Sequence, residues 1–261
     1  MSLFLNLNII LNSVCKKRKM KVIKLDAIDS TNDFLKGLSS GQELENFTIV
    51  SANSQSKGKG QMGAVWVSEA GKNLIMSILI KEFIADINQI FDLNIVVSVS
   101  IIEALELLNI PDLSIKWPND IMSYNKKIGG ILIENSIRSD GSINSVVGLG
   151  LNVNQTNFDN LPRASSLAVV CDANFNRDDL LESIKNKIVG NLSIWRVSPS
   201  HFNSRYRNYL FKIGVPMPFK DQNGIKFMGI IQGVSSNGKV EILLEDDLIT
   251  EFDIKEVQML F

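Results

Sequence analysis

The chain has 261 residues, of which 45% are hydrophobic and 21% are charged, so it can bury a sizeable core as a globular protein. Its formal net charge of −1 provides no global field for nucleic acid or an anionic membrane, so any anion site must be local. Two cysteines and a single histidine, His201, exclude a Cys/His metal cluster and argue against histidine-based nucleophilic catalysis.

Residues 1–19 begin with an apolar stretch that is followed by the basic run Lys16–Lys19. A secretory signal peptide has the opposite order, and this stretch is too short to span a bilayer. We interpret residues 1–19 as a poorly ordered extension or the product of an upstream translation start, with the folded protein beginning at Met20. Cytoplasmic residence without membrane association is the default expectation.

Periodicity and turn residues predict short strands and two helices in the first half of the chain. The predicted strands are Val22–Leu25, Phe47–Ala52 and Asn73–Ile80, then three that begin at Leu113, Lys127 and Ile143. The predicted helices begin at Asp29 and span Asp86–Asn109. The last two strands flank the turn sequence Ser139–Ser142, and strands joined by a tight turn are antiparallel. We therefore expect an α+β fold with a mixed, largely antiparallel sheet and helices packed against it.

In the second half of the chain, the predicted elements change from helices to short strands. Helices are predicted for Arg177–Trp195 and Pro199–Leu210, and Asn-Gly turns at Asn223 and Asn237 favour hairpins. Residues 212–261 are therefore predicted to form a small β-barrel, appended to a larger domain of residues 20–211.

The stretch SKGKGQMGAVW, residues 56–66, contains three glycines in the G-x-G-x-x-G spacing of dinucleotide-binding turns. The context does not fit, because five polar residues separate the first glycine from the preceding strand and no helix follows. A P-loop is also excluded, since Ala64 and Val65 stand where Lys and Ser or Thr are needed. An ordinary surface loop remains one interpretation. The alternation of Lys57 and Lys59 with glycine favours a loop that closes over an anion.

A second polar stretch, residues 115–135, contains KWPND at 116–120. Pro118 interrupts a strand, so the polar pair that follows it is expected where the backbone turns. An ordinary β-turn with surface lysines remains open as an interpretation. Lys127, however, stands at the start of an apolar strand with Gly129 and Gly130, where a flat ligand or another backbone can approach closely. A lysine at the edge of such a groove is suited to bind phosphate.

Four motifs, in this order and spacing, resemble the biotin protein ligases: DSTN, GKGQMGAVW, KWPND with KKIGGILIE, and GLGLNVN. The resemblance covers most of Lys21–Asn154. It implies a catalytic domain related to class II aminoacyl-tRNA synthetases, followed by an SH3-like domain. It also implies the activity of a biotin–[acetyl-CoA-carboxylase] ligase. Such an enzyme forms biotinoyl-5′-AMP and pyrophosphate from biotin and ATP with Mg²⁺, then transfers biotin to a lysine of a biotin carboxyl carrier protein or domain.

The resemblance also implies roles for individual residues. The implied biotin-binding residues are Ser30, Thr31, Asn32, Gln55, Gly58, Gly60, Gly129 and Gly130, the first three of them at the ureido ring. The implied ATP- and adenylate-binding residues are Lys59, Gln61, Gly63, Trp66, Asn119, Lys127 and Asn152. Lys127 and Lys59 are the implied catalytic cations, and Asp120 is implied near the metal, acting through the phosphates or from outside the direct ligands. Many members carry arginines at positions 59, 61 and 64, so this loop has less positive charge.

Regulatory members of that family carry an N-terminal helix-turn-helix domain, which the nineteen residues before Met20 are too few to hold. DNA binding is therefore not expected, whereas a homodimer is left open. Two alternatives remain. One is a lipoate or octanoate ligase or transferase of the same fold, and the other is a non-catalytic ligand- or RNA-binding module.

Overall fold

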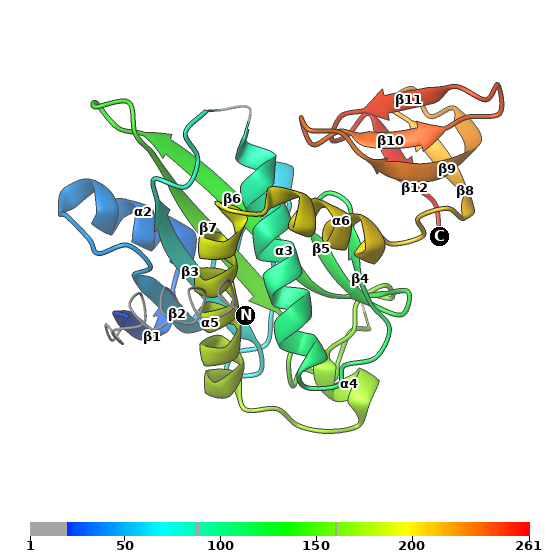
Figure 1. The fold of residues 1–261 in the computed structure, drawn as a ribbon. Coiled ribbons are helices and arrows are strands. Elements are labelled where there is room, and N and C mark those ends of the chain that lie inside the picture. Colours follow the sequence, from blue (N-terminus) through cyan, green and yellow to red (C-terminus); the bar gives the residue numbers. More distant parts are fainter. Residues whose placement is uncertain (1–19, 87–88, 160) are drawn as a thin grey trace, which may run out of the picture.

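The computed structural model describes residues 20–86, 89–159 and 161–261, and Figure 1 shows that these residues form two sheets and several helices. The interpretation of residues 1–19 lies outside the described residues. The larger sheet has the strand order β1-β2-β3-β7-β6-β5-β4. Its strands are β1 (Val22–Ile28), β2 (Ile49–Gln55), β3 (Leu74–Lys81), β4 (Leu113–Lys116), β5 (Asp120–Ser123), β6 (Lys126–Ile137) and β7 (Ile143–Leu151). Only the β1–β2 pair in this sheet is parallel.

Helices cover both faces of the larger sheet. The helices are α2 (Thr31–Gly41), α3 (Ile90–Glu106), α4 (Leu167–Cys171), α5 (Arg177–Trp195) and α6 (Pro199–Tyr209). Figure 1 shows α3 and α5 in front of the sheet, while α2 packs on the opposite face. The helix starts follow from their caps: Ser30 Oγ accepts the Asp33 backbone N–H, and Asn176 caps α5 in the same way.

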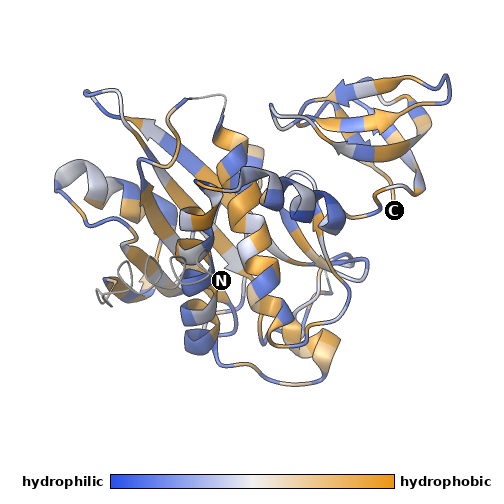
Figure 2. Ribbon diagram, in the orientation of Figure 1, coloured by the Kyte–Doolittle hydropathy of each residue, from blue (hydrophilic) through white to orange (hydrophobic). Residues whose placement is uncertain are grey.

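The two faces of the larger sheet have different surroundings because side chains alternate along each strand. On β3, Leu74, Met76, Ile78 and Ile80 belong to the main core with α3 and α5. Leu79 faces the other way and joins a smaller cluster under α2, with Leu35, Leu44, Val50 and Val146. Both faces of β3 are buried, which explains the continuous apolar run that Figure 2 colours orange in the middle of the sheet.

The second sheet is antiparallel and lies beside α6, with strand order β11-β10-β9-β8-β12. Its strands are β8 (Pro216–Asp221), β9 (Lys226–Val234), β10 (Val240–Leu243), β11 (Ile249–Phe252) and β12 (Val257–Met259). Both predicted Asn-Gly turns form hairpins, β8–β9 and β9–β10. Phe219, Ile231 and Ile242 are continuous with the main core, so apolar packing joins the second sheet to the first.

The predicted α+β class with a mixed sheet is confirmed, and most element positions agree within a few residues. The turn predicted after Pro118 is found at residues 117–119, but strand β5 (Asp120–Ser123), which follows it directly, was not predicted. The strand has only four residues and follows Pro118, so its apolar pattern is too short to stand out. The short helix α4 was also not predicted.

We expect the α2-side cluster to be important for stability. Leu35 is fully buried, so Leu35→Ala should lower the free energy of unfolding by about 2–5 kcal/mol through lost burial and a residual cavity. Leu107→Ala is the control, because Leu107 is 65% exposed and its truncation should change stability by less than about 0.5 kcal/mol. Urea denaturation of both variants measures the difference, and equal losses would contradict the assignment of Leu35 to a packed core.

Candidate functional site

A cavity of about 590 Å³ lies on the α2 face of the larger sheet, between the sheet and the glycine-containing loop of residues 58–66. Its floor is a row of residues that pair across four neighbouring strands: Asp120 of β5, Gly130 of β6, Gly150 of β7 and Ile75 of β3. The adjacent row contains Leu132, Gly148 and Ser77. The centre of the floor therefore consists largely of bare backbone.

The glycines of this floor have no room for a side chain. A Cβ on Gly150 would lie 2.4 Å from Cε2 of Trp66, and one on Gly148 would lie 2.4 Å from Oδ1 of Asn32. Real Cβ atoms do not approach other atoms this closely, so any larger residue would displace the Trp66 ring or the Asn32 amide. The two glycines thus allow these two side chains to lie against the sheet.

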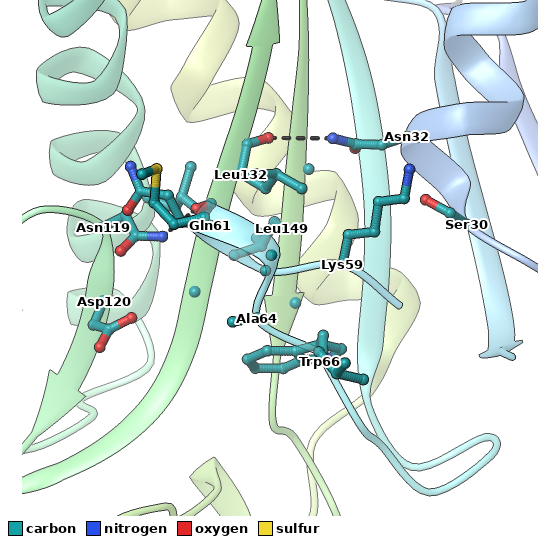
Figure 3. Close-up of a pocket in the computed structure, with 18 of the residues that line it drawn as sticks. Ser30, Asn32, Lys59, Gln61, Ala64, Trp66, Asn119, Asp120, Leu132 and Leu149 are labelled. Atoms are coloured by element: carbon teal, nitrogen blue, oxygen red, sulfur yellow. Dashed lines mark hydrogen bonds between the residues drawn. The ribbon is translucent and has the colours of Figure 1, made fainter. Parts of the chain in front are cut away.

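The glycine-containing loop is folded as a narrow hairpin over the cavity. Gly60 N–H donates to Ala64 O at 2.7 Å, and Trp66 N–H donates to Gly58 O at 2.9 Å. A tight turn at the tip uses left-handed backbone at Met62, with φ of 55°, and at Gly63, with φ of 82°. Figure 3 shows Gln61 of this loop beside Asn119 and Trp66 below Ala64, and both residues line the cavity.

One end of the cavity carries a buried network of neutral polar groups around Thr31 and Asn32. The Thr31 backbone N–H and hydroxyl both donate to Gln55 Oε1, at 2.7 Å and 3.0 Å. Ser77 Oγ lies 2.8 Å from Thr31 Oγ1 and 2.6 Å from Asn32 Oδ1. Asn32 Nδ2 donates to Glu134 Oε2 at 2.8 Å, and Figure 3 also shows its contact with the Leu132 carbonyl. These contacts fix the orientation of both amides, because the amide oxygen of each accepts a hydrogen bond and Asn32 Nδ2 donates to a carboxylate.

The other end of the cavity is cationic. Lys127 Nζ lies 2.6 Å from Asp120 Oδ1 and 5.7 Å from the Trp66 ring centroid. Lys116 approaches the same carboxylate at 3.8 Å. Burial lowers the pKa of Lys116 below its ordinary value; Asp120 opposes that shift, while the positive charge of Lys127 adds to it. Asn119 is held beside these groups because its Nδ2 donates to Ile131 O at 2.6 Å.

Two lysines, Lys59 of the loop and Lys57 just before it, pair with carboxylates at the start of α2. Lys59 Nζ lies 2.6 Å from Asp33 Oδ2, and Lys57 Nζ lies 2.8 Å from Asp29 Oδ2. The hydrogen bond from Lys59 lowers the pKa of Asp33, and the one from Lys57 lowers that of Asp29. Figure 3 shows the Lys59 side chain extending toward α2, away from Asp120. Lys59 thus connects the loop to the helix that carries Thr31 and Asn32.

The structure brings most of the predicted site residues together around this cavity. Those that line it are Ser30, Thr31, Asn32, Gln55, Lys59, Gly60, Gln61, Gly63, Trp66, Asn119, Asp120, Lys127 and Gly130. Three others do not line it. Gly58 supports the base of the hairpin, and Gly129 faces the opposite side of the sheet near Leu151. Asn152 is buried, and its amide donates to Ser165 O at 2.9 Å.

Several site residues were not singled out from the sequence. Ser77 and Glu134 hold the polar end, Gly148 and Gly150 form the floor, and Ile254 with Lys255 reaches the cavity from the β11–β12 connection. The two glycines, spaced by two residues on one predicted strand, were a usable signal for a bare sheet face. The other four positions carry no local signal, because only the pairing of distant segments brings them to the cavity.

The cavity has a floor of glycines, a basic loop above it, one neutral end and one cationic end. These features are typical of a domain that binds an elongated small ligand. Residues 25–152 match the Biotin/lipoate A/B protein ligase family. The chain therefore carries a domain of this family, which confirms the resemblance seen in its motifs.

Similar proteins extend the match beyond this domain. The chain is 28% identical over 241 residues to the Bifunctional ligase/repressor BirA of Bacillus spizizenii, covering 90% of this chain and 71% of that protein. It is 24% identical over 215 residues to the Biotin–[acetyl-CoA-carboxylase] ligase of Mycobacterium tuberculosis, covering 81% and 79% of the two chains. A solved structure of the Aquifex aeolicus biotin protein ligase in complex with biotin and ATP is similar, with a TM-score of 0.76 and 27% identity. That similarity covers 92% of this chain and 98% of the Aquifex chain.

Two further structural findings bear on the site. In residues 20–86, 89–159 and 161–261, no group of three or more His, Cys, Asp or Glu side chains is arranged to hold a metal ion. Within the same ranges, none of the helices combines the length and apolar character that crossing a bilayer requires.

The contact between Lys59 and Asp33 predicts how the loop responds to trypsin. The two side chains are 46% and 41% exposed, so the pair contributes only about 0.2–1 kcal/mol. Asp33→Asn should therefore raise the rate of cleavage after Lys59 by about two- to fivefold, if cleavage follows local opening of the hairpin. Asp178→Asn is the matched control, because it removes an exposed ion pair with Lys24 on β1. Equal cleavage rates in the two variants would show that Asp33 does not hold the loop.

Proposed function

We propose that this chain is a biotin protein ligase that activates biotin with ATP and then biotinylates a lysine of a biotin carboxyl carrier protein or domain. The family domain, the biotin ligase relatives and the similar Aquifex structure with biotin and ATP support this function. The observation that carries it is the division of one cavity into a neutral hydrogen-bonding end and a cationic end. Biotin has the same division, with a neutral ureido ring at one end and a carboxylate at the other.

The polar end suits the ureido ring, which presents N–H donors and a C=O acceptor. Thr31, Asn32 and Gln55 supply hydroxyl and amide groups of both kinds. Ser77 and Glu134 hold Thr31 and Asn32 in place, and Thr31 in turn holds Gln55. Because these side chains need not reorganise, little of the binding free energy is lost in ordering them.

The cationic end suits the reacting groups. A biotin carboxylate oxygen attacks the α-phosphorus of ATP, the bond to the bridging oxygen breaks, and pyrophosphate leaves. In the second step the acceptor lysine amine attacks the acyl carbon, AMP leaves, and the amine loses a proton. Lys127 neutralises charge that builds on the phosphate oxygens in the first step, where a fixed cation in a partly buried site is effective.

The loop and Trp66 close the middle of the cavity. Trp66 Nε1 is buried and has no hydrogen-bond partner among the described residues, and buried donors are seldom left unpaired. This donor lies against the bare backbone of Gly150 and is covered from the cavity, so a flat ligand would bond it only after the Trp66 ring shifts. A covered site also protects a reactive acyl-adenylate from water.

Mg²⁺ fits this site as a companion of ATP. Mg²⁺ is commonly held by one or two carboxylates together with substrate phosphates, and Asp120 is the carboxylate among the described residues that line the cavity. Asp120 would hold the ion with the phosphates, and the ion would supply neutralisation of phosphate charge. Asp120 also orients Lys127 through their ion pair.

The finer architecture is part of the proposal. We assign residues 20–211 to a catalytic domain related to class II aminoacyl-tRNA synthetases and residues 212–261 to an SH3-like domain. The break between the last helix, α6, and the second sheet supports this boundary. Cytoplasmic residence, the homodimer and the absence of DNA binding stay predictions.

The function is tested by biotin-dependent exchange of labelled pyrophosphate into ATP, with lipoate and octanoate as competing acids. We expect exchange with biotin alone, because the neutral polar end matches the ureido ring that the other acids lack. Exchange that requires lipoate or octanoate would favour the alternative ligase. No exchange with any acid would favour a non-catalytic module.

Lys127→Met should largely abolish this exchange while leaving biotin binding partly intact. Removal of one preorganised charge at the reacting phosphate is expected to cost roughly 10²- to 10³-fold in rate. Lys126→Met is the matched control, because Lys126 is exposed and bonds the Pro162 carbonyl outside the cavity. Exchange rates and calorimetric biotin binding should be measured for both. An exchange rate within about threefold of wild type for Lys127→Met would contradict its catalytic role.

A further inference from the structure

The second sheet contacts the larger domain through the β9–β10 turn, residues Ser235–Gly238, which we name the docking turn. The indole Nε1 of Trp117 donates to Gly238 O at 2.8 Å. A Cβ on Gly238 would lie 2.6 Å from Cδ2 of Phe91, so the turn backbone lies directly against the Phe91 ring. Phe91, at the start of α3, also makes an edge-to-face contact with Tyr206 of α6 at 5.7 Å between ring centroids.

A second turn in the same sheet provides an internal comparison. Asn223–Gly224 in the β8–β9 hairpin has the same residue pair, and Gly224 has a φ of +85° against +83° for Gly238. A Cβ on Gly224 would meet nothing within 4 Å. The left-handed backbone alone accounts for glycine at 224. At 238 the close approach to Phe91 imposes a second, independent requirement.

The docking turn is connected to the cationic end of the cavity by a short path. Trp117 is followed by Pro118, whose carbonyl accepts Asn94 Nδ2 at 2.8 Å. Asn94 lies one turn of α3 after Phe91, so one helix end contacts both the docking turn and this segment. Asn119 and Asp120 come next in the chain and line the cavity. The same sheet also places Ile254 and Lys255 at the cavity wall.

We propose that the docking turn is a positioning element for the cationic end: it fixes residues 117–120 through Trp117 and holds the β11–β12 connection over the cavity. The expected effect on ATP use rests on the proposed function, because it assumes that ATP binds at the cationic end. Loss of docking should weaken the use of ATP more than the binding of biotin. The polar end is built from α2, β2, β3 and the middle of β6, and none of its hydrogen bonds involves the second sheet.

The test compares Gly238→Ala with Gly224→Ala, because both place alanine at nearly the same left-handed φ and therefore share the backbone cost. Only Gly238→Ala also brings a methyl group against Phe91. We expect it to raise the KM for ATP in pyrophosphate exchange by about five- to tenfold, with the Kd for biotin within about twofold of wild type. Gly224→Ala should leave both constants within about twofold. Thermal unfolding establishes that the two variants are folded to the same extent.

A second variant tests the path through Trp117 without altering the turn. Trp117→Phe removes the N–H donor and keeps an aromatic ring, so it should raise the KM for ATP in the same direction. The double variant Trp117→Phe with Gly238→Ala should show less than the product of the two single effects, because both act on one contact. Hydrogen exchange should become faster at residues 116–121 and 253–256 in Gly238→Ala and stay unchanged in β1 and β2.

If the wild-type protein shows biotin-dependent exchange, two results would overturn the positioning role of the docking turn. One is an equal change of the KM for ATP in Gly238→Ala and Gly224→Ala. The other is a loss of biotin affinity in Gly238→Ala as large as its loss of ATP use, which a merely structural role would produce. Absence of biotin-dependent exchange in the wild type would contradict the proposed function instead. In that case hydrogen exchange still tests whether the docking turn fixes residues 117–120. Unchanged exchange rates at residues 116–121 in Gly238→Ala would overturn that role.

Discussion

The site depends on the bare backbone where β6 and β7 pair on the α2 face of the sheet. Gly130 lies opposite Gly150, and Gly148 follows one pleat further along the same face. The Trp66 ring and the Asn32 amide occupy the volume that Cβ atoms would fill at the two β7 positions. Since neither side chain could lie there otherwise, these glycines position the loop above the cavity and the polar network at its end.

The opposite face of the same strands forms the protein's main core. Val147, Leu149 and Leu151 alternate with the glycines of β7 and pack under α3 and α5. One strand therefore stabilises the fold on one side and provides the cavity floor on the other. Because the pleat fixes this alternation, a shift of register by one residue would exchange the two faces and destroy both core and cavity.

Local sequence signals predicted much of this structure, and the missing parts are those that depend on distant contacts. The helix predicted over Arg177–Trp195 is found at those bounds, and the structure adds that the Asn176 side chain caps its start. The glycine-containing loop was predicted as a mobile cover, but its sequence does not reveal that Lys59 would reach Asp33 across the chain. Ser77 is a small polar residue inside an apolar strand, and its role is evident only once α2 lies above β3. Lys255 is likewise placed by the docking of a second sheet.

The cationic end shows how a chain with a net charge of −1 can present a local anion site. Lys116 and Lys127 approach the single carboxylate of Asp120, and the Arg163 guanidinium lies 4.8 Å from the Phe261 ring centroid, which Lys116 also faces at 5.5 Å. Such a ring offsets cation repulsion by only about 0.5–1 kcal/mol per contact. Among these described residues, positive charge therefore exceeds negative charge. Burial lowers the pKa of Lys116, Asp120 opposes that shift, and the nearby charges of Lys127 and Arg163 add to it. Polyphosphate oxygens in this position would supply the missing negative charge, so the cluster favours an anionic ligand.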